Sequence, residues 1–311
     1  NGTLDVNNGT ADEAGRDLVM ADGSTLRRTS NGSVSDLIEA PGTYTLKYEG
    51  TAAVDAEAEE FLGNGTVSLL EVNTTGTGSN ILPADRQVGA FTVAAGPGRV
   101  DLQDGSTPNS PFTLTVTGSS TLNSGTVGTG GTDRGTLDAN GNIDVNGATV
   151  ASNVQSAGDF VFNAGNLNQV NLEFDGASDQ QFTLANSAVV GMLSMNQQSS
   201  SSPKVTLSGA PLGIATQLTL TNGLLVVDDG QFVALSQVGS TNGPFGNAVN
   251  PPFGFVTPVG ATPATVVHNP SAGNLSHVVG QVQQGVVAGT PSAQGTANGR
   301  FEWPVGSMDE F

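Results

Sequence analysis

Oxygen-bearing side chains recur at every second position in one short segment of the chain: Asp138, Asn140, Asn142 and Asp144. Carboxylate and amide oxygens at alternating positions are the ligands with which a calcium loop begins. The segment departs from that loop because Ile143 replaces the glycine at its sixth position, and Thr149 replaces the glutamate at its twelfth. It predicts a candidate calcium site, with a turn between two strands as the alternative, and we expect no other cofactor.

A second group of carboxylates lies between Ala52 and Leu62, among several alanines: Asp55, Glu57, Glu59 and Glu60. Four carboxylates this close could bind a cation or take part in acid–base chemistry. Charge runs of this kind usually face water. We therefore interpret the segment as a solvated acidic turn or a single short helix.

Other catalytic patterns are missing from the sequence. His268 and His277 are the only histidines, and no third ligand at motif spacing accompanies them. There is no G-x-S-x-G elbow. The glycine-rich run from Gly125 to Thr132 lacks the lysine and the following helix of a phosphate loop. Because the basic residues are also scattered along the chain, we predict that the protein is not an enzyme.

The elements that must position these residues are short strands. Tyr44–Gly50 alternates apolar with polar residues, and Phe112–Gly118 does the same. This period of two gives each strand one buried face and one wet face. Asn222-Gly223 and similar pairs supply the positive φ angles that tight turns require. Such strands, repeated at short spacing, are typical of sandwiches and of β-solenoids alike.

Composition supports an all-β chain with a thin core. Glycine accounts for 43 of the 311 residues, charged residues for 12% and hydrophobic residues for 36%. Apolar residues are spread evenly, which suits an elongated stack or several small sandwiches better than one thick globule. We predict an elongated parallel β-helix or β-solenoid with on the order of 22 residues per turn. A tandem array of β-sandwiches is the alternative.

The charge balance restricts the partners. The formal net charge is −19, with nine Lys plus Arg, so nucleic acid and anionic membrane surfaces are poor partners. No run approaches the ~18 apolar residues of a membrane-spanning helix, and we expect no membrane insertion. The chain has no cysteine, which excludes disulfides and thiol catalysis.

We divide the chain into four regions. Residues 1–120 form an N-terminal β repeat region, and residues 121–242 form a β-solenoid repeat region. Residues 243–275 are rich in proline and glycine, and we predict a packed loop or cap because proline removes ladder donors. Residues 276–311 are predicted to return to strands and to continue in a longer precursor.

One part of the sequence resembles a known class of proteins. Gln180–Leu184, Leu193–Asn196, Val205–Leu207 and Leu218–Leu225 together are similar to the repeat of very large exported surface proteins of Bacteroidetes-like bacteria, which are adhesin-type β-solenoids. The segment from Ser276 to Gly306 looks like the Y-V-x-G … F-x-F-P-V-G stretch that follows such repeats. The resemblance implies export, surface display and a structural or adhesive role, and it assigns no catalytic residues.

The function that we expect is therefore that of an extracellular structural or adhesive component of a bacterial cell surface or surface filament. It would assemble through strand edges and repeat ends, either with itself or with neighbouring domains of the same large surface protein. Glycans are a further candidate partner. The alternative is a carbohydrate-binding or polysaccharide-degrading β-helix protein.

Overall fold

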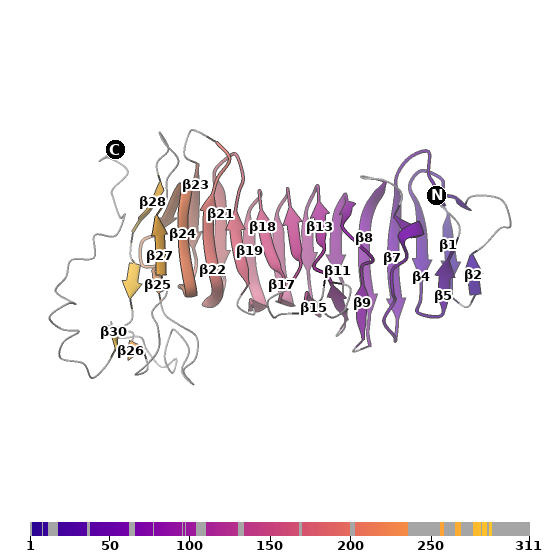
Figure 1. Ribbon diagram of the computed structural model, residues 1–311, viewed down its shortest axis with the longest axis horizontal. Coiled ribbons are helices and arrows are strands. Elements are labelled where there is room, and N and C mark those ends of the chain that lie inside the picture. Colours follow the sequence, from indigo (N-terminus) through magenta and orange to yellow (C-terminus); the bar gives the residue numbers. More distant parts are fainter. Residues whose placement is uncertain are drawn as a thin grey trace. The chain divides into compact units, whose positions relative to one another are not determined.

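The structure is a computed structural model of the 311-residue chain. It describes residues 2–7, 9–11, 18–35, 38–61, 66–76, 78–94, 96, 98–103, 110–129, 134–167, 170–199, 203–235, 256–257, 265–268, 276–280, 282–284 and 286–287. The fold is an all-β parallel β-solenoid (Figure 1). The chain divides into two compact units, Asn1–Gly158 with Asn163–Asn166, and Asp159–Phe162 with Leu167–Phe311.

In the first unit, each complete turn contributes a strand to each of three parallel stacks, and strands of successive turns lie side by side (Figure 1). The first stack contains β1 (Thr3–Val6), β4 (Ser24–Arg28), β7 (Tyr44–Gly50), β8 (Val67–Thr74), β11 (Ala90–Val93), β14 (Ser120–Leu122) and the start of β17 (Ile143–Val150). The second stack contains β9 (Ser79–Ile81), β12 (Arg99–Asp101), β15 (Thr126–Val127) and the end of β17. The third stack contains β10 (Arg86–Val88), β13 (Thr113–Val116), β16 (Thr136–Ala139) and β18 (Asn153–Ser156).

The first turns are less regular than the later ones. Two short parallel pairs lie there, β2 (Gly9–Ala11) with β5 (Gly32–Val34) and β3 (Leu18–Val19) with β6 (Ile38–Glu39). The segment between β7 and β8 contains a 3-10 helix, η1 (Ala58–Glu60). Within the described residues, no helix is long and apolar enough to cross a membrane.

The pairing register gives the length of a turn. Thr3 lies opposite Thr25, and Thr25 lies opposite Thr45, so these turns take 22 and 20 residues. Other turns of the first unit range from 17 residues (Leu137 to Val154) to 29 (Phe91 to Ser120). The predicted turn length of about 22 residues is confirmed.

The core of the first unit consists of inward side chains stacked in register. Leu26, Leu46, Leu70 and Phe91 are successive partners in the first stack, and all four are fully buried. Burial of such a side chain stabilises the fold by about 1.5–3 kcal/mol. The alternation that predicted Tyr44–Gly50 as a strand therefore marks the true inner face.

Glycine occupies a corner of this unit where adjacent turns approach closely. Gly141 donates its N–H to the carbonyl oxygen of Gly118, at 3.1 Å. A Cβ atom on Gly141 would lie 2.5 Å from that oxygen, which is closer than atoms can pack. Part of the high glycine content is thus explained by corners that leave no room for a side chain.

The second unit also has three parallel stacks. One contains the first part of β19 (Phe160–Leu167), β21 (Gln180–Leu184), β23 (Lys204–Ser208), the end of β24 (Leu212–Val227) and β28 (Ser276–Val279). Another contains β20 (Asn171–Phe174), the end of β22 (Ala188–Asn196), the middle of β24 and β27 (Thr265–His268). The last contains the starts of β22 and β24, then β25 (Val233–Leu235) and β29 (Val282–Gln284), and β26 (Val256–Thr257) pairs separately with β30 (Val286–Val287).

Aromatic rings fill part of the core of this unit. The ring of Phe182 packs edge-on against that of Phe160, with centroids 5.4 Å apart, and lies 5.3 Å from that of Phe174. Gly223 has a φ of +95° inside β24, between segments that pair in different stacks. The predicted positive φ at Asn222-Gly223 is confirmed, but it forms a solenoid corner and not a hairpin.

The predicted parallel β-solenoid is confirmed, and the sandwich alternative is wrong because the registered pairings between strands are parallel. The division at residues 120, 242 and 275 stays a prediction. Most of the proline-rich region 243–275 and the end of the chain after residue 287 lie outside the described residues.

Candidate functional site

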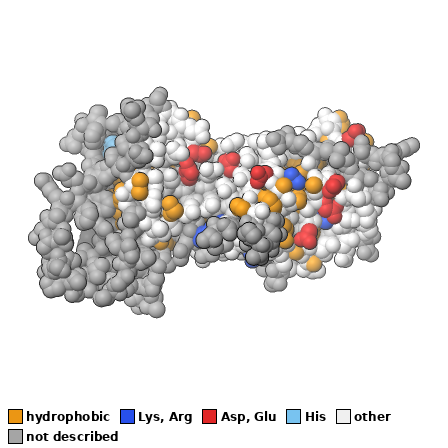
Figure 2. Space-filling model, viewed as in Figure 1, with side chains coloured by type: hydrophobic (Ala, Val, Ile, Leu, Met, Phe, Trp, Pro, Cys, Tyr) orange, Lys and Arg blue, Asp and Glu red, His pale blue; other side chains and the backbone are white. Residues whose placement is uncertain are grey.

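A column of charged side chains runs along the outer face of the first stack in the first unit. Its members face outward from β1, β4, β7 and β8: Asp5, Arg27, Lys47, Glu49 and Glu71. The register places Asp5 opposite Arg27, and Lys47 opposite Glu71. On the face in view in Figure 2, acidic side chains are more frequent than basic ones.

Each basic residue of this column contacts a carboxylate. Lys47 Nζ lies 2.9 Å from Glu71 Oε1 and 3.5 Å from Glu49 Oε2. Glu49 also accepts a hydrogen bond from Arg27 Nε. The hydrogen bond with Glu71 is the main cause that raises the pKa of Lys47. These pairs are partly exposed, so each contributes about 0–1 kcal/mol, and salt weakens them.

Strand β1 has one edge paired and one edge facing away from its partner. The Thr25 and Thr29 N–H groups of the next turn bond to the carbonyl oxygens of Gly2 and Val6. Since successive backbone groups of a strand point to opposite sides, the N–H and C=O groups of Thr3 and Asp5 point away from β4. Among the described strands, β4 is the one that pairs in register with β1.

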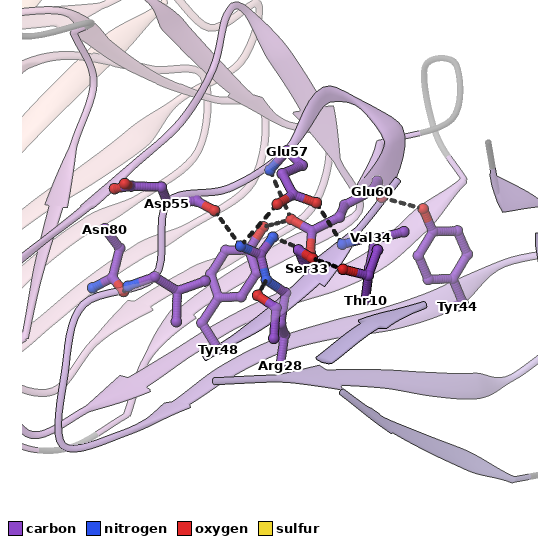
Figure 3. A network of polar contacts seen from close by, with 12 residues as sticks. Thr10, Arg28, Ser33, Val34, Tyr44, Tyr48, Asp55, Glu57, Glu60 and Asn80 are labelled. Carbon is purple, nitrogen blue, oxygen red and sulfur yellow. Dashed lines mark hydrogen bonds and ion pairs between the residues drawn. The ribbon is translucent and has the colours of Figure 1, made fainter. Parts of the chain in front are cut away.

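A second group of charges lies inside the first unit, where Arg28 meets the segment between β7 and β8 (Figure 3). Arg28 Nη1 lies 2.5 Å from Glu60 Oε1, and Arg28 Nη2 donates to the carbonyl oxygen of Asp55 at 2.6 Å. Arg28 Nε donates to the carbonyl oxygen of Gly32 at 3.0 Å. The Arg28 side chain is 4% exposed and that of Glu60 is 0% exposed. All three types of nitrogen in this guanidinium group are thus satisfied inside the protein.

Two tyrosines complete the network on the other side of Glu60 (Figure 3). Tyr48 Oη donates to Glu60 Oε2 at 2.8 Å, and Tyr44 Oη donates to the backbone carbonyl oxygen of Glu60. Burial raises the pKa of Glu60, although the nearby Arg28 opposes this shift. Burial, reinforced by the Glu60 carboxylate, raises the pKa of Tyr48 well above its ordinary value.

Glu57 joins the network to the preceding turn. Its Oε2 accepts a hydrogen bond from the backbone N–H of Val34, at 2.5 Å, and its Oε1 lies 3.4 Å from Arg28 Nη2. On the other side, the Val54 N–H donates to Asn80 Oδ1 at 2.9 Å. Side chains thus take the place of part of the backbone ladder at this turn. We call residues 54–60 the clasp segment, because they are bonded to the turns before and after them.

Shifted pKa values can mark an active centre, but they also occur in structural ion pairs. Here the two carboxylate oxygens of Glu60 accept bonds from Arg28, Tyr48 and the Glu57 N–H, and the side chain has no exposed surface. The geometry supports a structural task, which is to hold the clasp segment in the core. A substrate has no access to these atoms in this conformation.

This network corrects the interpretation of the acidic segment. A short helix is present at η1, as one alternative predicted, but solvation of the whole segment is wrong because Glu60 is fully buried. The sequence contained one usable signal: Leu26 is an inward residue, so a period of two also places Arg28 inward. A buried arginine requires an acidic partner.

The candidate calcium ligands lie on both sides of one corner. Asp138 faces outward from β16 in the third stack, where it accepts a hydrogen bond from Thr115 Oγ1 at 3.2 Å. Asp144 faces outward from β17 in the first stack, and the exposed Asn140 and Asn142 lie in the turn between them. Within the described residues, no three His, Cys, Asp or Glu side chains are grouped to hold a metal ion. The calcium site stays a prediction.

The two histidines also remain without an assigned role. His277 is 5% exposed in β28. His268 ends β27, and its side chain lies outside the described part of the chain.

Comparison with known proteins gives no relatives. No family model, curated protein or solved structure matches the chain.

Proposed function

We propose that the protein is an extracellular structural or adhesive component of a bacterial cell surface or surface filament. In this proposal it assembles through strand edges and turn ends, with copies of itself or with neighbouring domains of the same large surface protein. It acts as a scaffold and not as an enzyme. The repeat resemblance and the acidic, polar outer surface support an exported protein.

The observation that carries this proposal is the outer edge of β1. Every turn of the first unit is joined to the next by parallel strand pairing, and β1 directs the backbone groups of Thr3 and Asp5 away from β4. A strand edge of this kind is a template for an added strand, which gains main-chain hydrogen bonds on docking.

Sedimentation of the full chain over a range of concentrations tests the proposal, together with electron microscopy of the concentrated protein. We expect association that increases with concentration. Thr3→Pro removes an outward N–H without removing a bond to β4, so it should weaken association. Thr3→Val retains the N–H and is the matched control.

Association that is equal in both variants would show that the β1 edge is not used. A chain that stays monomeric at every concentration would argue against assembly by the protein alone. Surface location is tested separately, by protease treatment of intact cells of the producing organism, where cleavage of the protein is expected.

A further inference from the structure

The charge column described above ends at the strand whose outer edge we propose as a docking site. It holds three carboxylates and two basic groups, so the column as a whole carries an excess of one negative charge. Arg27 and Lys47 are neighbours in register, and Glu49 contacts both of them. The column thus places an acidic group beside each basic group.

Asp5 is the carboxylate of this column with the greatest exposure. Its side chain is 44% exposed, against 15% for Glu49 and 22% for Glu71. Both of its oxygens lie 3.4 Å from the same atom, Arg27 Nη1. Charge-assisted hydrogen bonds are usually ~2.7–2.9 Å long, so Asp5 keeps capacity for a second cationic partner.

We infer that Asp5 selects what docks on β1: a strand of a second polypeptide that places Lys or Arg opposite this carboxylate. Resting on the proposed function, the inference adds the chemistry of the partner. A strand added to β1 lies ~4.8 Å away, so the side chain opposite Asp5 is an immediate neighbour. Opposite charges on facing residues of paired strands are favourable, and like charges are unfavourable. Asp5 therefore admits a basic strand and rejects an acidic one.

Two labelled peptides serve as probes, acetyl-Gly-Thr-Val-Lys-Val-Thr-Gly-amide and the same peptide with Glu in place of Lys. Their binding to the full chain is measured by fluorescence anisotropy at low salt and again at high salt. We expect the Lys peptide to bind at least about threefold more tightly than the Glu peptide. High salt should reduce this ratio because the groups are exposed.

Three variants make the test specific. Asp5→Asn should remove the preference, and Asp5→Lys should reverse it, while circular dichroism verifies that both variants fold. Thr3→Pro should weaken binding of both peptides because it changes the edge itself.

Equal binding of the two peptides to the wild-type chain would overturn the inference, and so would a preference that survives in Asp5→Asn. Failure of both peptides to bind would also overturn it. These outcomes are distinct from failure of the proposed function. Association that Thr3→Pro weakens, without any charge preference, would retain the docking edge and reject selection by Asp5.

Discussion

The clasp segment and the corner at Gly141 belong to the same unit but join adjacent turns in different ways. At Gly141 the backbone of one turn bonds directly to that of the preceding turn, through a 3.1 Å hydrogen bond to Gly118. At the clasp segment, the side chains of Arg28, Glu57 and Asn80 supply bonds between turns. The first arrangement requires the absence of a side chain, and the second requires several charged ones.

This difference teaches how a solenoid accommodates an irregular turn. Direct backbone pairing satisfies polar groups without placing a charge in the core. Where the chain departs from strand geometry, buried polar groups still need partners, and charged side chains provide them at the cost of desolvation. The two regions should therefore respond differently to substitution.

The largest effect is expected from removing one partner of the buried ion pair. Glu60→Ala leaves the Arg28 guanidinium buried without its carboxylate, and it also removes an acceptor from Tyr48. Breaking a buried pair in this way costs about 3–5 kcal/mol of unfolding free energy. Urea denaturation measures the change.

Glu59→Ala is the matched control for this prediction, because Glu59 is adjacent in η1 and is only half-buried. It should change the unfolding free energy by less than about 0.5 kcal/mol. Similar effects of the two substitutions would contradict a structural role for the Arg28–Glu60 pair.

A smaller loss is expected at the glycine corner. Gly141→Val places a side chain where even a Cβ would lie 2.5 Å from the Gly118 carbonyl oxygen. Overpacking of this kind costs about 1–3 kcal/mol. Gly2→Ala is the control, since no atom lies within 4 Å of its added Cβ. Thermal unfolding that is unchanged in Gly141→Val would show that the corner can open without loss.

These two positions show how far the sequence leads. The inner face of β7 follows from the alternation of Tyr44, Leu46 and Tyr48, because burial of a strand face is a local pattern. The burial of Glu60 is different, since its partner Arg28 is 32 residues away. Only the stacking of turns brings the two together. The sequence therefore predicted the strands and the turn length, but it placed the acidic segment in water.

The alkaline response of the clasp segment sharpens the comparison. The pKa of Tyr48 is raised in the folded protein, so the stability that depends on its neutral form is complete below pH ~10 and is lost at higher pH. Unfolding free energy should fall by up to about 1.4 kcal/mol per pH unit above that point.

Tyrosinate absorbance follows this change directly, because both tyrosines of the chain lie in the network. We expect the Tyr48 signal to appear together with unfolding. In Tyr48→Phe, this contribution to the pH dependence should vanish. Ionisation of both tyrosines near pH ~10 in the folded protein would refute the arrangement around Glu60.

The smallest effect is expected at the candidate calcium ligands, which share a corner with Gly141. Calcium and magnesium at matched ionic strength should raise the melting temperature equally, by screening the net charge of −19. An additional increment with calcium would establish a site if Asp138→Asn combined with Asp144→Asn abolished it. The same double substitution should leave the response to monovalent salt intact.

The short spacing between paired residues has a consequence for how the first unit folds. Its strands find their partners 17 to 29 residues away, wherever they lie along the chain. The entropy lost on closing each loop is therefore similar for every turn and does not grow with the number of turns. Folding can begin at one turn and propagate to its neighbours, so a chain with more turns would acquire additional steps and no higher barrier to each.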